Sequence, residues 1–182
     1  LVHQQLYNAG EAMLTGDKEL AYKVISRERR VNAFELKIDS DCEDIIALYA
    51  PVAIDLRFVL AMYKINTNLE RLGDFAESIA RFAGNLPEGE PIDPQLVKET
   101  RVEEMLSELL SMISLTKEAF EKESSEIASR IFLKDNLIDE INHNSTAIIA
   151  KYIEEHKGSA LAGLYMAGVI RKMERFRDHC TN

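Results

Sequence analysis

Apolar residues recur at alternating steps of three and four along most of this chain, and this spacing restricts its fold more than any other feature. The clearest stripe, between residues 52 and 83, comprises Met62, Ile65, Leu69, Leu72, Ala76, Ile79 and Phe82. Similar stripes mark 18–49, 96–121 and 124–155. Alternation of three and four is typical of long helices that pack at shallow angles in bundles. The sequence therefore predicts an all-α fold.

Helix-breaking residues divide these stripes into six expected helices. Their ranges are roughly 1–15, 18–49, 52–83, 95–121, 124–155 and 159–182. Asp17 follows the break at Thr15-Gly16 and is expected to cap the second helix. Three of the four prolines lie within 84–94, a composition that indicates a linker or a long loop.

Two related segments indicate an internal duplication. NLERLGDFAESIA (68–80) resembles KMERFRDHCTN (172–182), with Glu70 aligned to Glu174 and Asp74 to Asp178. We therefore expect two tandem three-helix-bundle repeats, each with one short helix followed by two long ones. The first repeat spans 1–84, the linker 85–94 and the second repeat 95–182. Because the sequence stops within the second copy of the motif, we expect that repeat to be truncated at its C-terminus.

Charge and cysteine usage exclude several classes of protein. Acidic side chains outnumber basic ones by 31 to 22, for a net charge of −9, whereas non-specific nucleic-acid binding needs a basic surplus. Cys42 and Cys180 are far apart in sequence, which argues against a disulfide framework or a thiolate zinc site and favours a reducing, cytoplasmic compartment. The apolar runs are too short for membrane insertion. We find no Walker, GxGxxG, GxSxG or HExxH motif.

Pairs of oxygen-bearing side chains at i and i+4 suggest metal sites. Such pairs share one helix face, and like charges there repel slightly, so their repetition in both halves calls for a reason. If the two long helices of each repeat are antiparallel, the pairs meet at the same height, as in carboxylate metal sites on helix bundles. The candidate ligands are Glu28, Asn32, Glu70 and Asp74 in the first repeat and Asp135, Asp139, Glu174 and Asp178 in the second. Ligands of this kind accept Fe, Mn, Mg, Ca and sometimes Zn, so the metal is not identified.

Two alternatives stay open for these acidic faces. They also fit a plain helical scaffold, since Arg71 can pair with Asp74 one turn away and leave a solvated, salt-bridged surface. A carboxylate-bridged dinuclear metal enzyme is the second alternative. It is disfavoured, because the Glu-x-x-His spacing of buried di-iron sites occurs once only, at Glu140 and His143.

The most distinctive stretch of the sequence resembles the PhoU family of phosphate-transport regulators. It is PVAIDLRFVLAMYKINTNLERLGDFAESIARFA (51–83), together with its partial copy MERFRDHCTN (173–182). The resemblance implies metal clusters at the E/D-x-x-x-D pairs, which match at three of the four places. Asn32 stands where the fourth pair would have an acid, so the first-repeat site has one charge fewer. Arg177 stands where the first repeat has Gly73, and its cationic side chain is expected to crowd or neutralise the second-repeat cluster.

The same resemblance implies a function. Members of this family act in the cytoplasm as negative regulators of phosphate uptake and of phosphate-responsive signalling. The resemblance implies contacts with a sensor histidine kinase and with the ATPase of a phosphate ABC transporter, and it implies no catalysis. We therefore expect a non-enzymatic, metal-binding helical adaptor that forms a homodimer.

Overall fold

The structure is a computed structural model, and it describes residues 1–86, 92–156 and 160–181. Its helices are α1 (Val2–Thr15), α2 (Lys18–Tyr49), α3 (Ala53–Gly84), α4 (Pro94–Thr100), α5 (Val102–Glu121), α6 (Ser125–Phe132), α7 (Asp135–Glu155) and α8 (Ala160–Thr181). No strand occurs in the described ranges, so the predicted all-α fold is confirmed.

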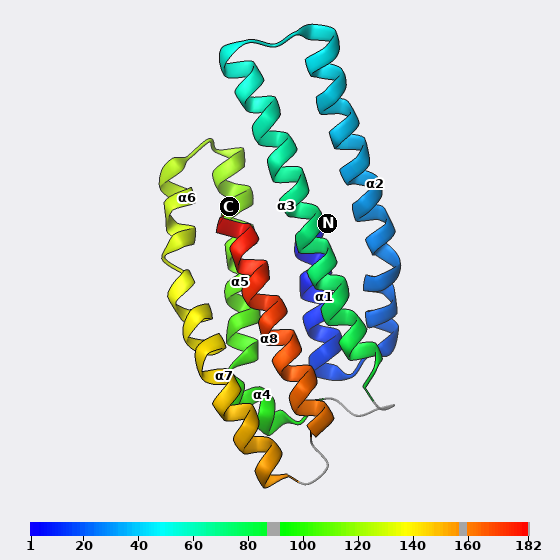
Figure 1. Cartoon of the computed structure of the whole chain (residues 1–182), viewed down its shortest axis with the longest axis vertical. Coiled ribbons are helices and arrows are strands. Elements are labelled where there is room, and N and C mark those ends of the chain that lie inside the picture. The colour runs from blue at the N-terminus through cyan, green and yellow to red at the C-terminus, as the bar shows by residue number, and fades with distance from the viewer. Residues whose placement is uncertain (87–91, 157–159, 182) are drawn as a thin grey trace.

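The first repeat consists of α1, α2 and α3 (Figure 1). Gly16 ends α1 in the left-handed conformation (φ 71°), which glycine adopts without the steric cost of a Cβ. The backbone N–H of Leu20 donates to Asp17 Oδ1 over 2.9 Å, which confirms Asp17 as the cap of α2. The α2–α3 hairpin is the longest part of the molecule and extends past the other helices (Figure 1).

The second repeat has the same order but is more broken than the sequence predicted. The expected helix at 95–121 is divided at Arg101, whose φ of 56° separates α4 from α5. The expected helix at 124–155 is divided at 133–134 into α6 and α7. Ion pairs hold both breaks, since Arg101 reaches Glu140 of α7 over 2.7 Å and Lys134 reaches Glu108 of α5 over 3.1 Å.

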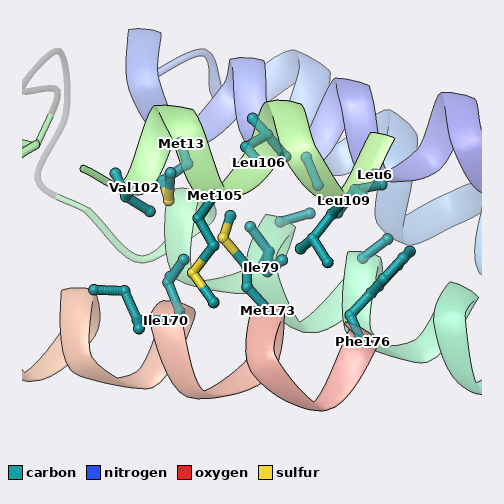
Figure 2. Packing of buried hydrophobic residues seen from close by; sticks show 14 of the residues in the cluster. Leu6, Met13, Ile79, Val102, Met105, Leu106, Leu109, Ile170, Met173 and Phe176 are labelled. Atoms are coloured by element: carbon teal, nitrogen blue, oxygen red, sulfur yellow. The ribbon is translucent and has the colours of Figure 1, made fainter. Parts of the chain in front are cut away.

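The core lies where the repeats meet, between α1 and α3 of the first and α5 and α8 of the second (Figure 2). The two repeats thus share one hydrophobic interior, flanked by α2 on one side and by α6 and α7 on the other (Figure 1). The fully buried side chains shown there include Leu6, Met13, Ile79, Met105, Leu109, Ile170, Met173 and Phe176. This shared core fixes α3 and α8, which carry the two acidic motifs, side by side.

The distal half of the α2–α3 hairpin is packed differently, because large apolar side chains there remain exposed. On α3 the stripe that is buried from Leu72 onward continues toward the tip as Leu69, Ile65, Phe58 and Ile54, all at least 37% exposed. Apolar surface of this extent is usually covered in a native assembly by another segment or another chain.

Parts of three sequence-based predictions lie outside the described residues. They are half of the linker at 85–94, of which 87–91 are not described, the junction of the last two expected helices at 157–159, and the end of the last motif at Asn182. None of the described helices combines the length and the apolar character that a membrane-spanning segment needs.

Candidate metal centre

The first-repeat site is built around a buried carboxylate. Glu28 points from α2 toward α3, its residue is only 5% exposed, and neither of its carboxylate oxygens has a hydrogen-bond partner in the described structure. Buried charged groups are ordinarily paired or bound to a metal, because leaving water without compensation costs several kcal/mol. An orphaned carboxylate at this depth is therefore an exception that requires an explanation.

Gly73 makes this close approach possible. A Cβ at Gly73 would lie 2.9 Å from Val31 Cγ1 and 3.2 Å from Glu28 Oε2, so a side chain there would displace both neighbours. The glycine of the LERLGD motif thus lets the backbone of α3 lie directly against the Glu28 carboxylate. Glu70 and Asp74 flank this glycine on the same helix, at three residues before it and one residue after it.

The electrostatic environment of this cluster opposes the ionisation of its acids. The pKa of Glu28 rises from 4.5 to about 7, first because burial disfavours the charged form and then because Asp74, Glu77 and Glu70 repel it. The pKa of Glu70 is also raised, by burial and next by the charge of Asp74. The cluster is thus short of positive charge and would gain from a cation.

The residues predicted as ligands in the first repeat differ in their exposure to solvent. Asn32 lies one turn beyond Glu28 and is exposed to solvent. The sequence pattern did not single out two further acids whose charges act on this cluster, namely Glu77, which raises the pKa of Glu28, and Glu35, which raises that of Glu70. Continuing the three-and-four spacing past Asp74 and Asn32 would have found both. Arg81 Nη2 donates a hydrogen bond to Glu77 Oε1 over 2.6 Å, so Glu77 is also ion-paired.

The second-repeat acids gather around an arginine instead. Arg177 Nη1 lies 2.6 Å from Asp135 Oδ1, and Nη2 lies 2.9 Å from Asp139 Oδ1, 3.2 Å from Asp178 Oδ1 and 3.5 Å from Glu174 Oε1. The Arg177 side chain is only 9% exposed. All four acids proposed for this repeat therefore meet at one spot, around a guanidinium.

The two acidic motifs also face one another across the junction of the repeats. A groove of about 520 Å³ lies between α3 and α8 and is lined by three equivalent pairs, Arg71 and Arg175, Asp74 and Asp178, and Phe75 and His179. The His179 and Phe75 rings lie 5.6 Å apart, and His179 Nδ1 is 2.9 Å from Asn68 Oδ1. The internal duplication is thus visible as a pseudosymmetric arrangement of side chains.

The two clusters differ in whether they fit a cation. As the side chains stand, no three His, Cys, Asp or Glu residues within 1–86, 92–156 and 160–181 form a metal-coordinating group. The first cluster nevertheless fits a cation chemically, because both oxygens of buried Glu28 are unpaired and the charges of Asp74, Glu77 and Glu70 repel it. The second does not, because Arg177 already uses its oxygens.

Comparison with known proteins agrees with the repeats seen here. The chain matches the PhoU domain over residues 1–83 and again over 102–182. It is 31% identical over 182 residues to a phosphate-specific transport system accessory protein PhoU homolog from Burkholderia, covering 100% of this chain and 77% of the relative. It is 33% identical over 185 residues to the accessory protein PhoU of Escherichia coli K12, covering 100% and 74%.

Solved structures show the same fold. The crystal structure of PhoU from Pseudomonas aeruginosa superimposes with a TM-score of 0.87 at 26% identity, covering 100% of this chain and 85% of that one. The phosphate transport system regulatory protein PhoU from Streptococcus pneumoniae also gives 0.87, at 28% identity, with 100% and 84% covered. These relatives are named as accessory or regulatory proteins rather than as enzymes. Sequence, fold and internal repeat agree, and the chain belongs to the PhoU family.

Proposed function

We propose that this chain is a non-enzymatic regulator of phosphate uptake that senses or uses a bound cation in its first repeat. Its family membership and the names of its relatives, which are accessory proteins of the phosphate-specific transport system, support the phosphate part of this proposal. The observation that carries the cation part is Glu28, a buried carboxylate without a hydrogen-bond partner and with other acids around it.

Glu28, Glu70 and Asp74 would hold the cation, with Glu77 beside them. An all-oxygen set suits hard ions such as Mg²⁺, Ca²⁺ and Mn²⁺, and it also accepts Fe and Zn. A bound cation would offset both the burial and the repulsion that raise the pKa of Glu28. Since its ligands come from α2 and α3, it would also tie the two long helices together at that height.

The partners are proposed from the family and from the surface. We expect a sensor histidine kinase and the ATPase subunit of a phosphate ABC transporter as partners, action in the cytoplasm, and a homodimer. The exposed apolar side chains on the distal α2–α3 hairpin support the presence of a covering partner, because such surface is seldom left open to water. As a negative regulator, the chain would reduce uptake when phosphate is sufficient.

The test is replacement of the natural protein in its own cells. Deletion of the gene is expected to raise phosphate uptake and phosphate-starvation gene expression under phosphate sufficiency, and the wild-type gene restores both to normal. Tagged protein should co-purify with the kinase or the transporter ATPase under the same conditions. Unchanged uptake and expression after deletion, with neither partner recovered, would contradict the regulatory proposal.

The role of the cation is tested separately in the same cells. Glu28→Gln keeps the size of the side chain but removes the charge that a cation needs. Glu43→Gln, at an exposed position on the same helix, is the matched control. If Glu28→Gln restores regulation as fully as the wild type does, the cation is not needed and the cluster is part of a plain scaffold.

A further inference from the structure

The two repeats differ at one position in the centre of each acidic cluster. Glu70 and Asp74 correspond to Glu174 and Asp178. The residue directly before the aspartate is Gly73 in the first repeat and Arg177 in the second. Gly73 leaves room for the Glu28 carboxylate, whereas Arg177 inserts its own guanidinium among the acids of its repeat. The same fold thus presents an uncompensated cluster in one half and a compensated cluster in the other.

A second difference complements the first. Glu28 corresponds in the repeat to Asp135, whose side chain is one methylene shorter. The long acid faces the residue that has no side chain, since a Cβ at Gly73 would come within 3.2 Å of Glu28 Oε2. The short acid faces the long cation, and Arg177 Nη1 reaches Asp135 Oδ1 over 2.6 Å. Each pair fills its site, and exchanging one member alone would leave a clash or a gap.

We propose that Arg177 is an internal cation that takes the place of a metal ion in the second repeat, so that only the first repeat of this chain binds metal. This inference rests on the proposed cation site in the first repeat. It separates two clusters that the sequence pattern alone treats as equivalent.

The chemistry of the guanidinium supports this assignment. Arginine stays protonated at any pH that the protein tolerates, and its planar set of N–H donors suits several carboxylates at once. A metal ion at the same place would have to take oxygens from Asp135, Asp139 and Asp178 and would face a fixed positive charge within the same small space. Expelling Arg177 would break all four of its ion pairs and leave its buried N–H donors without those acceptors.

Two conservative variants test the proposal without disturbing the fold. Mn²⁺ alone is the probe, counted per chain by equilibrium dialysis with metal analysis. Asp74→Asn and Asp139→Asn each remove one charge from an exposed acid, one in each cluster. We expect Asp74→Asn to lose bound Mn²⁺ and Asp139→Asn to bind as much as the wild type. Loss of Mn²⁺ in Asp139→Asn would overturn the proposal, because it would show a metal in the second repeat.

Removing the arginine supplies the reciprocal test. Arg177→Gly, alone and with Asp135→Glu to copy the first-repeat pair, is expected to about double the Mn²⁺ bound per chain. Arg175→Gly removes the same charge from an exposed position on α8 and is expected to bind no more than the wild type. Circular dichroism with and without Mn²⁺ reports whether each variant is folded. A folded Arg177→Gly chain that gains no Mn²⁺, singly or with Asp135→Glu, overturns the proposal.

The outcomes separate this inference from the function on which it rests. If the wild-type chain binds no Mn²⁺ but the Arg177→Gly chain does, the first-repeat site is refuted while the role of Arg177 stands. If the wild type binds Mn²⁺ through Asp74 and the Arg177→Gly chain binds no more, the first-repeat site stands and Arg177 has no such role.

Discussion

Replacing Glu28 by Gln should stabilise the protein in the absence of metal. The buried carboxylate has a pKa of about 7 in the folded chain against 4.5 in water, because burial and the charges of Asp74, Glu77 and Glu70 oppose its ionisation. This difference corresponds to about 3 kcal/mol of unfolding free energy when the group is ionised. The glutamine amide of the variant has no charge to desolvate, and its N–H groups can donate to the neighbouring carboxylates.

The sign of the pH dependence follows from the raised pKa. Between pH 4.5 and 7 the folded chain holds a proton on Glu28 that the unfolded chain has released. The contribution of this proton to stability is therefore complete below 4.5 and is lost as the pH rises through about 7. The Glu28→Gln chain lacks this loss, so it should match the wild type near pH ~4 and exceed it by up to about 3 kcal/mol near pH ~8.

Urea denaturation followed by circular dichroism, from about pH 4 to about pH 8 with a chelator present, measures this difference. Glu43→Gln on the same helix is the control and should follow the wild-type curve. Added Mn²⁺ should reverse the order, since at about 1,000 times its dissociation constant a ligand stabilises by about 4.1 kcal/mol and only the wild type would bind it. A Glu28→Gln chain that is less stable than the wild type at the alkaline end without metal would refute the reasoning.

Three further substitutions test the packing and the hydrogen bonding that hold the site in place. Phe176→Ala removes a fully buried side chain on α8 and should lower the free energy of unfolding, measured by urea denaturation, by about 3 to 5 kcal/mol. A decrease of less than about 1 kcal/mol would mean that the side chain is not in the core. Gly10→Ala would place a methyl group against Leu106 across the junction of the repeats. Although Ala has the better helix propensity, the free energy of unfolding in the same assay should fall by about 1 to 2 kcal/mol. Tyr152→Phe removes the hydroxyl that donates to Asp93 over 2.5 Å and should cost about 1 to 2 kcal/mol at neutral pH. That hydrogen bond lowers the pKa of Asp93, so the difference between the two chains should vanish as acid titration protonates Asp93 in the folded state; a constant difference would contradict this.

The sequence predicted the long helices because their apolar spacing is a local property. It did not predict the breaks at Arg101 and at 133–134, since both depend on contacts between helices. Arg101 adopts a positive φ, and its side chain forms ion pairs with Glu104 and Glu140. The pair with Glu140 joins residues far apart in sequence, so no local pattern predicts it. Lys134 occupies one position of the otherwise largely apolar stripe at 124–155, and the structure shows it in an ion pair with Glu108 on α5.

The candidate site was predictable where it depends on helix geometry and not where it depends on packing between helices. Antiparallel geometry alone brings Glu28 to the height of Glu70 and Asp74, and the structure places them together. The burial of Glu28 was not predictable, because it depends on the close approach of the α3 backbone at Gly73. The sequence did indicate that Arg177 would crowd or neutralise its cluster, but only the structure shows that one guanidinium reaches all four acids.

A cation bound in the first repeat, on the buried carboxylate of Glu28, underlies both the proposed function and the role assigned to Arg177. It can be sought in a crystal of the whole chain grown with Mn²⁺, with diffraction data collected at a wavelength where manganese scatters anomalously. We expect an anomalous peak between α2 and α3 at coordination distance from Glu28, with none beside Arg177. A peak within the second-repeat cluster, or no peak near Glu28 at saturating Mn²⁺, would contradict this.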